Sequence, residues 1–204
     1  MTKDQTHWND RYARGDIPWD TGQVSSELIR ILQQFSIGPC RVLEMGCGTG
    51  TDAVYLKQQG FDVVAVDISP LAVERARQRA AEADVEITLL AANVLSLGDV
   101  HPPFPLIYDR GLYHAIRREQ LDPFLGVLGE MTTPGSLYLT MAGNANEQVE
   151  GEEGPPRVSA EQMCHELSGL FHLVQLTECH FEGVVVDDRQ INPLAWSALW
   201  RRKP

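Results

Sequence analysis

Residues 43–50, Leu-Glu-Met-Gly-Cys-Gly-Thr-Gly, decide the fold of this chain of 204 residues. They complete a short apolar run that begins at residue 40, and a helical pattern follows at 52–59. A glycine-rich turn between a strand and a helix is typical of open α/β sheets, in which ligands bind beyond the carboxyl ends of the strands. Glycines let the backbone turn tightly and approach a ligand closely. The stretch therefore predicts an α/β fold and the place of its binding site.

The rest of the chain alternates strand and helix patterns. We expect strands at 40–45, 61–66, 85–90, 104–109, 136–141, 171–181 and 194–201, and helices at 24–35, 52–59, 70–83, 117–131 and 159–170. Ser69-Pro70 and Ser159-x-x-Gln162 are typical helix starts. The alternation favours right-handed βαβ units, whereas the last two strands leave no room for a helix between them. The predicted fold class is therefore α/β, a doubly wound, Rossmann-like, mostly parallel seven-stranded sheet that ends in a C-terminal antiparallel hairpin.

Two segments stand apart from this pattern. We expect a single domain over 1–204, with an aromatic N-terminal arm at 1–22 that carries Trp8, Tyr12 and Trp19. Residues 143–157 are rich in glutamate, asparagine, glycine and proline, which predicts an acidic solvated loop or a flap over the site.

Composition limits the possible partners. The formal net charge of -11 argues against broad contact with nucleic acid or an anionic membrane. No apolar run is long enough to span a membrane, and no signal peptide is expected. The four cysteines show neither C-x-x-C pairs nor zinc-ligand spacing, so we expect a reduced, cytoplasmic protein without a metal. A monomer or a homodimer fits equally well.

The loop at 43–50 discriminates between two cofactor classes. A dinucleotide site needs a third glycine at the position of Thr51, and Asp52 would repel a diphosphate at the helix N-terminus. S-adenosylmethionine has no phosphate and carries a sulfonium cation, so an acidic loop containing Glu44 suits it better. Asp67 ends the second strand 21 residues after Gly46, where an acid accepts hydrogen bonds from ribose hydroxyls. A structural turn with a solvated aspartate is the alternative.

Two further strand ends carry polar residues. Asn93 follows the third strand and could accept a hydrogen bond from an adenine amino group, or it could simply cap the turn. The fourth strand ends in Asp109-Arg110-Gly111, which indicates a site at this edge or, alternatively, an internal pair between Asp109 and Arg110.

These residues resemble class I S-adenosylmethionine-dependent methyltransferases. The E-x-G-x-G-x-G motif at 44–50 and the acidic strand end at Asp67 match the first two motifs of that class. A narrower resemblance to the thiopurine and thiol S-methyltransferase-like group rests on residues 8–12, 18–20, 109–111 and 195–199. The group often has a second arginine-bearing motif after D-R-G, and residues 112–116 depart from it. The resemblance therefore leaves the substrate open.

The resemblance implies roles for individual residues. The arm would cover the methionine end of the cofactor, and Arg110 would face the substrate. The residues expected to bind S-adenosylmethionine are Trp8, Tyr12, Trp19, Glu44, Gly46, Cys47, Gly48, Gly50, Asp67, Ile68, Asn93, Val94 and Asp109. Ordinary packing is the alternative for the arm aromatics, and Cys47 is interpreted as a small packing residue rather than a nucleophile.

Arg110 and His114 are the candidate catalytic residues. Methyl transfer from a sulfonium needs alignment and exclusion of water, so a dedicated base is optional. Arg110 would favour the thiolate form of a thiol acceptor, and His114 could take a proton from an oxygen or nitrogen acceptor. The predicted function is methyl transfer to a small molecule, with a thiol among the acceptors. The alternatives are a methyltransferase-fold binding or sensor protein without turnover, and an NAD-dependent oxidoreductase.

Overall fold

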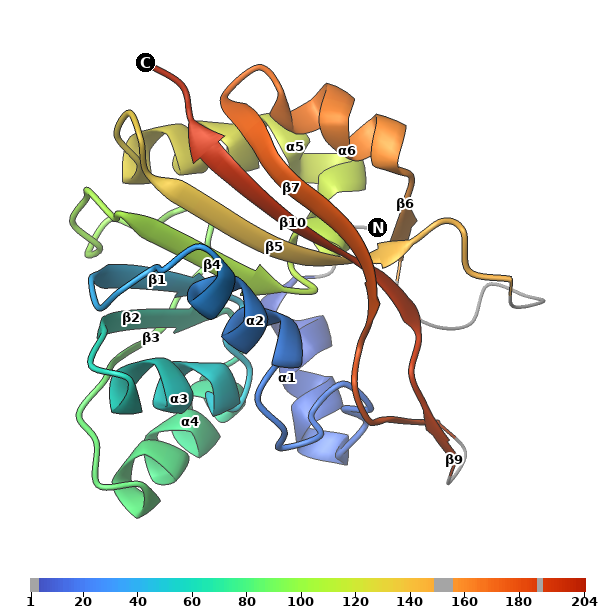
Figure 1. The fold of residues 1–204 in the computed structure, drawn as a ribbon. Coiled ribbons are helices and arrows are strands. Elements are labelled where there is room, and N and C mark those ends of the chain that lie inside the picture. Colours follow the sequence, from blue (N-terminus) through green and yellow to red (C-terminus); the bar gives the residue numbers. More distant parts are fainter. Residues whose placement is uncertain (1–3, 149–155, 187–188) are drawn as a thin grey trace.

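A computed structural model of the chain describes residues 4–148, 156–186 and 189–204 (Figure 1). Five parallel strands run in the order β3-β2-β1-β4-β5, and they are β1 (Arg41–Met45), β2 (Asp62–Asp67), β3 (Thr88–Ala91), β4 (Leu106–Arg110) and β5 (Leu137–Asn144). Next to β5 lies β10 (Leu194–Arg202), which pairs antiparallel with both β5 and the edge strand β7 (Phe171–His180). The predicted fold class, with its parallel sheet and antiparallel C-terminal hairpin, is confirmed.

Helices cover both faces of the sheet (Figure 1). On one face lie α2 (Ser26–Gln34), α3 (Thr51–Gln58) and α4 (Pro70–Glu82), and on the other lie α5 (Tyr113–Met131) and α6 (Ala160–Leu167). Successive side chains of a strand point to opposite faces. Val42 accordingly packs in the core on the α2–α4 side, and Leu43 packs in the core on the α5–α6 side. This three-layer arrangement buries both faces of the parallel strands.

The strand order reverses between β1 and β4. From β1 the chain proceeds outward to β2 and β3, and it then returns to add β4 and β5 on the other side of β1. The chain therefore leaves the carboxyl ends of β1 and β4 toward opposite layers of helices. This opens a crevice at the position where open α/β sheets bind ligands. The turn at 43–50 lies at this point.

The arm contains a helix that the sequence did not predict, α1 (Gln5–Arg14). The Asp4 side chain accepts a hydrogen bond from the His7 backbone N–H at its start, and Gly15 ends it in the left-handed region. Arg75 of α4 donates to the backbone oxygen of Tyr12 at 2.9 Å. Local caps, this tertiary contact and the burial of Tyr12 together hold a helix that is otherwise mostly polar.

Other boundaries differ from the predictions for identifiable reasons. The third strand begins at Thr88 instead of 85, because the Val85 N–H still bonds the Ala80 carbonyl and so completes the end of α4. α5 begins at Tyr113, before the predicted start at 117, and kinks at Gln120, three residues before Pro123. The capping box at Ser159 is confirmed.

The C-terminal half contains three short strands that were not predicted. β6 (Arg157–Val158) pairs with β5, and β8 (Val184–Val186) pairs with β9 (Arg189–Ile191). Of the predicted loop at 143–157, residues 149–155 lie outside the described residues, while 143–144 belong to β5. Within the described ranges, no helix has the length and apolar character needed to cross a membrane.

Candidate active site

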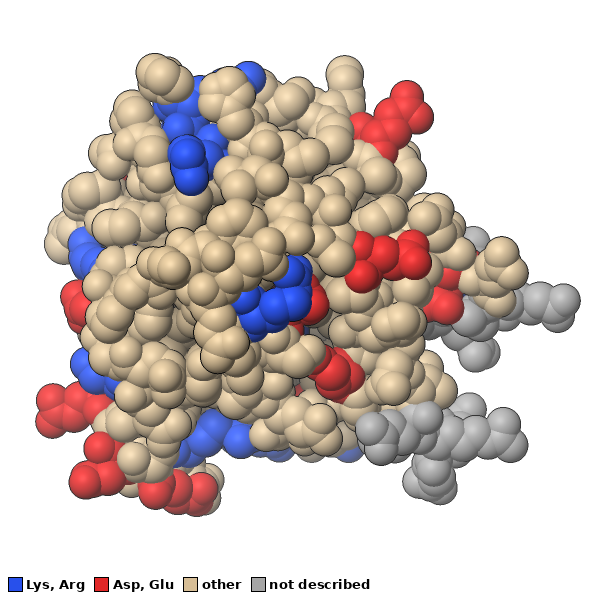
Figure 2. Space-filling view, in the orientation of Figure 1, with Lys and Arg blue, Asp and Glu red and all other residues tan. Residues whose placement is uncertain are grey.

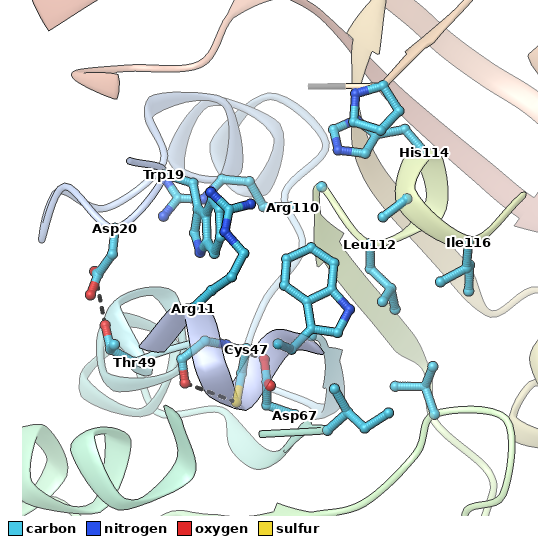
Figure 3. A pocket seen from close by; sticks show the side chains of 18 of the residues that line it. Arg11, Trp19, Asp20, Cys47, Thr49, Asp67, Arg110, Leu112, His114 and Ile116 are labelled. Atoms are coloured by element: carbon cyan, nitrogen blue, oxygen red, sulfur yellow. Dashed lines mark hydrogen bonds between the residues drawn. The ribbon is translucent and has the colours of Figure 1, made fainter. Parts of the chain in front are cut away.

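A cavity of about 950 Å³ opens at the carboxyl edge of β1, β2 and β4 (Figure 3). Its lining includes the turn after β1, the arm, the start of α5 and residues 181, 182, 184, 191 and 193. Of the residues predicted for the site, these line the cavity: Trp8, Tyr12, Trp19, Glu44, Gly46, Cys47, Gly48, Asp67, Ile68, Asn93, Val94, Arg110 and His114. A volume of this size accommodates a nucleoside and a small second molecule.

The turn after β1 is held against β2 by backbone hydrogen bonds. The N–H groups of Gly46 and Cys47 both donate to the Val66 carbonyl, at 2.7 and 3.0 Å. Gly48 has a φ of 55°, and a Cβ there would lie 3.1 Å from the Tyr12 hydroxyl. The missing side chain therefore lets the arm approach the turn.

Asp67 faces the cavity from the end of β2. Its Oδ2 accepts from the Gly48 N–H and its Oδ1 from the Ser69 N–H, each at 2.9 Å. Burial raises the pKa of Asp67, and the backbone hydrogen bonds oppose that rise. Each carboxylate oxygen has a second lone pair, so Asp67 can still accept two hydroxyl hydrogens.

Glu44 presents an unpaired oxygen in the same region. The residue is 4% exposed, and its buried Oε2 has no hydrogen-bond partner in the described structure. Burial raises the pKa of Glu44 well above its usual range, and the nearby Asp52 raises it further while Arg110 opposes the rise. Because an unsatisfied buried acceptor is costly, the position favours a ligand that brings a donor or a cation.

The structure places two predicted site residues outside the cavity lining. Gly50 precedes α3 with a φ of 80°, and a Cβ there would lie 2.8 Å from the Cβ of Ala76 in α4. Its lack of a side chain thus serves helix packing. Asp109 is fully buried, accepts from the backbone N–H groups of Leu112 and Tyr113, and takes the Tyr138 hydroxyl at 2.6 Å. Asp109 therefore holds the start of α5.

The aromatic side chains of the arm pack against one another at the cavity wall. Trp19 meets Trp8 and Tyr12 edge to face, with ring centroids 5.6 and 6.3 Å apart. The Arg11 guanidinium lies 4.3 Å from the Trp19 ring centroid. Asp20 accepts from the Thr49 hydroxyl at 2.9 Å, which fastens the arm to the turn. The aromatic side chains of the arm therefore pack together and also line the cavity.

Arg110 pairs with Asp52 and not with its neighbour Asp109. The Arg110 Nε lies 3.2 Å from Asp52 Oδ2, and Arg110 also donates to the Gln23 carbonyl at 3.3 Å. Asp52 in turn accepts from the Ser25 N–H at 2.9 Å and from the Tyr108 hydroxyl at 2.8 Å. The sequence marked Asp52 only as a group that repels phosphate, and nothing in the sequence pointed to this pairing.

His114 is oriented by the backbone of β5. Its Nδ1 accepts the Gly143 N–H at 2.8 Å, and its ring meets Phe181 edge to face at 5.9 Å. Because Nδ1 is an acceptor here, the neutral ring carries its proton on Nε2. The geometry therefore favours a hydrogen-bond donor at Nε2 over the predicted proton acceptor.

The remaining predicted residues divide between packing and lining. Cys47 is buried, and burial followed by the Asp67 charge raises the pKa of its thiol well above the usual range. It therefore remains a thiol, in agreement with a packing role. Asn93 caps its turn, since its Oδ1 accepts the Leu95 N–H at 2.9 Å, while it also lines the cavity beside Val94.

Sequence reasoning missed the opposite wall of the cavity. Leu112 and Ile116 of the α5 region line it (Figure 3). The segment that joins β7 to β10 adds Phe181, Glu182, Val184, Ile191 and Pro193. The sequence showed this segment only as a strand end and a polar connection, so no signal was available to place it over the site.

Comparisons with known proteins agree with this geometry. A family model described as Thiopurine S-methyltransferase matches residues 3–195. A 2-heptyl-1-hydroxyquinolin-4(1H)-one methyltransferase of Mycobacteroides abscessus is 26% identical over 147 residues, which span 72% of this chain but only 64% of that relative. A thiopurine S-methyltransferase of Legionella pneumophila is 25% identical over 179 residues, 80% of each chain.

Solved structures show the same fold. The structure entitled "Conversion of a Disulfide Bond into a Thioacetal Group during Echinomycin Biosynthesis" superposes with a TM-score of 0.85. It shares 22% sequence identity, and the match covers 98% of this chain and 92% of the other.

Proposed function

The chain belongs to the thiopurine S-methyltransferase family, a family of S-adenosylmethionine-dependent methyltransferases, and from this membership we propose that it methylates a small apolar molecule. The family resemblance predicted from the sequence is confirmed. Relatives named for a thiopurine and for a hydroxyquinolone support a sulfur or an oxygen acceptor. A thiol is the first acceptor to test, because a few per cent of a thiol is already thiolate at neutral pH.

The observation that carries the proposal is the division of one cavity into two chemically different ends. One end has the glycine turn, Asp67 and the unpaired buried oxygen of Glu44. The other end has the apolar side chains of the α5 region and of segment 181–193. Arg110, which pairs with Asp52, and His114 also line the cavity.

The residues of the first end fit S-adenosylmethionine. The orphaned oxygen of Glu44 suits a cationic group, and the free lone pairs of Asp67 suit two ribose hydroxyls. The close approach at Gly48 brings the Tyr12 hydroxyl against the turn, so the arm can cover a ligand held there. When bound, the cofactor supplies a methyl group activated by a positively charged sulfur.

The chain's own residues then have to align the acceptor and keep water out. Trp8, Tyr12 and Trp19 close the cofactor end, and aromatic faces stabilise a nearby sulfonium by about 0.5–2 kcal/mol. Arg110 and the Nε2–H of His114 are proposed hydrogen-bond donors to the nucleophilic atom. Alignment alone can lower the barrier by about 7–11 kcal/mol, so no residue needs to act as a general base.

The charge around Arg110 bears on the thiolate hypothesis. Asp52 already offsets the guanidinium at 3.2 Å, and the charges of Glu44 and Glu182 act on it as well. We therefore propose that Arg110 orients the acceptor more than it ionises it, and that a thiol acceptor loses its proton to solvent before transfer.

The test combines binding with turnover. Isothermal titration should show heat with S-adenosylmethionine and S-adenosylhomocysteine and none with NAD. A panel of thiols, halides, thiopurines, phenols and amines, with S-adenosylhomocysteine release as the readout, should then identify the acceptor. No heat with either nucleoside would refute the proposal, and heat without release across the panel would favour a binding or sensor protein.

Four broader expectations remain proposals. We propose that residues 1–204 act as one domain, that the protein is cytoplasmic, that it functions as a monomer or a homodimer, and that nucleic acid is not its substrate. On the face shown in Figure 2, the described basic side chains form separate groups, with uncharged and acidic residues around them. That face offers no continuous basic surface to a phosphate backbone.

A further inference from the structure

Glu182 lies in the segment between β7 and β8 and lines the cavity at its apolar end. Its two carboxylate oxygens have different surroundings. Oε1 accepts from the backbone N–H of Ser26 at 3.0 Å and from the Ser26 hydroxyl, at the start of α2. Oε2 is buried and has no hydrogen-bond partner in the part of the chain that the structure describes.

The surroundings of Glu182 offer little to satisfy that second oxygen. Its neighbours in the lining from the same segment are Phe181, Val184, Ile191 and Pro193, all of them apolar. A carboxylate oxygen that is buried without a partner is unfavourable, and natural structures keep such groups mainly where a ligand or a catalytic role accounts for them.

The local charges determine which ligand would suit this oxygen. The charges of three carboxylates that line the cavity, Asp52, Glu44 and Glu182, all act on the guanidinium of Arg110. Arg110 is already paired with Asp52. An anionic group on an acceptor would therefore meet net negative charge here, whereas an N–H, an O–H or an ammonium would complete the bonding of Glu182.

We propose that Glu182 is a specificity-determining residue that accepts a hydrogen bond from an N–H, O–H or ammonium group on an otherwise apolar acceptor and disfavours acceptors with an anionic group. This inference rests on the proposed function, because it assumes that the apolar end of the cavity holds the methyl acceptor. It narrows the substrate class to neutral or cationic molecules with a donor placed away from the methylated atom.

Glu182 also has a structural contact that the test must separate from recognition. Through Oε1 it fastens the chain just after β7 to the start of α2. Glu182→Gln keeps one acceptor oxygen for Ser26 and replaces the other oxygen with an amide donor. Ser26→Ala removes the hydroxyl donor to Oε1 and leaves Oε2 intact. Glu178→Gln is the matched control, since Glu178 is an exposed glutamate on β7 outside the cavity lining.

The experiment uses three benzenethiols that differ only in the para substituent: methyl, aminomethyl and carboxylate. Their affinity for the complex with S-adenosylhomocysteine is measured by calorimetry, and their methylation is measured with S-adenosylmethionine. The wild type should prefer the aminomethyl thiol over the carboxylate thiol by at least tenfold. Glu182→Gln should reduce that ratio at least tenfold while changing the affinity for the methyl thiol less than threefold.

The outcomes distinguish the two proposals. The role of Glu182 would be overturned if Glu182→Gln changed the affinity for all three thiols equally or left the ratio of aminomethyl to carboxylate thiol unchanged. It would also be overturned if Ser26→Ala changed that ratio to the same extent. Each of these results is what a purely structural contact predicts. Absence of heat with S-adenosylhomocysteine would instead refute the proposed function, and the inference with it. Glu178→Gln should retain the wild-type ratio.

Discussion

The substitution Gly50→Ala tests whether this glycine serves the cofactor or the packing of α3 on α4. The φ of Gly50 is 80°, a conformation that costs an L-residue about 1–2 kcal/mol. The new methyl group would lie 2.8 Å from the Cβ and 3.2 Å from the Cα of Ala76. Overpacking of this kind costs about 1–3 kcal/mol. We expect the free energy of unfolding to fall by roughly 2–5 kcal/mol.

Urea unfolding of purified protein measures this change. Gly135→Ala is the control, because Gly135 has a φ of 91° and open space around the position of its missing Cβ. It should lose only the conformational part, about 1–2 kcal/mol. Adding Ala76→Gly to Gly50→Ala should recover part of the lost free energy of unfolding. It removes the Ala76 methyl group that the new Cβ would approach to 2.8 Å.

The affinity for S-adenosylhomocysteine decides the functional question. Since Gly50 lies outside the cavity lining, folded Gly50→Ala protein should bind this nucleoside within threefold of wild type. Equal destabilisation in Gly50→Ala and Gly135→Ala would refute the packing argument. A tenfold loss of affinity in fully folded Gly50→Ala protein would instead indicate that Gly50 contributes to the cofactor site.

Three further changes test other parts of the structure. Asp67→Asn should weaken S-adenosylhomocysteine binding by about tenfold or more, the equivalent of losing one hydrogen bond to a charged group. Asp62→Asn, an exposed change on the same strand, should leave the affinity unchanged, and calorimetry compares the two variants. His114→Leu should lower the free energy of unfolding by about 1–3 kcal/mol because a buried N–H of β5 loses its acceptor, whereas His114→Asn, which can still accept, should lose less in urea unfolding. Burial raises the pKa of Glu166, but hydrogen bonds and ion pairing from α5 outweigh this effect, so the pKa lies below its usual value and the stabilisation is lost as pH falls below about 4.5. Glu166→Gln should therefore lower the free energy of unfolding by about 1.5–3 kcal/mol at pH 7 and by less at pH 3. The same loss at both pH values would contradict this prediction.

Short-range patterns account for what the sequence predicted correctly about the fold. The apolar runs at β1, β2 and β4 and the lack of room for a helix between β7 and β10 are both visible along the chain. The helix α1 was missed because Trp8, Tyr12 and Ala13 are its only apolar residues in a polar segment. It depends on the contact between Arg75 and the Tyr12 carbonyl, whose partners lie 63 residues apart.

The same limit applies to the site. Residues at the ends of parallel strands, such as Asp67 and Arg110, were found because parallel strands bring their carboxyl ends to one edge. Gly50 was predicted for the site but lies outside the cavity lining, because close approach to a helix and close approach to a ligand require the same residue type. Glu182 was missed because it lies in the connection after β7, which folds back over the cavity, and no local sequence pattern predicts that course.

The contacts of Asp52 and Arg110 join the two ends of the cavity. Asp52 accepts from the Ser25 N–H, just before α2, and Arg110 donates to the Gln23 carbonyl two residues earlier. The linker that follows the arm is therefore held by the same ion pair that fixes the arginine of the acceptor end. Further along, Ser26 contacts Glu182, so residues 23–26 are tied to both walls of the acceptor end. Because the arm leads directly into these residues, its position and the shape of the proposed acceptor end are linked through residues 23–26. In the proposed enzyme, the placement of this one segment would therefore affect both ends of the cavity together.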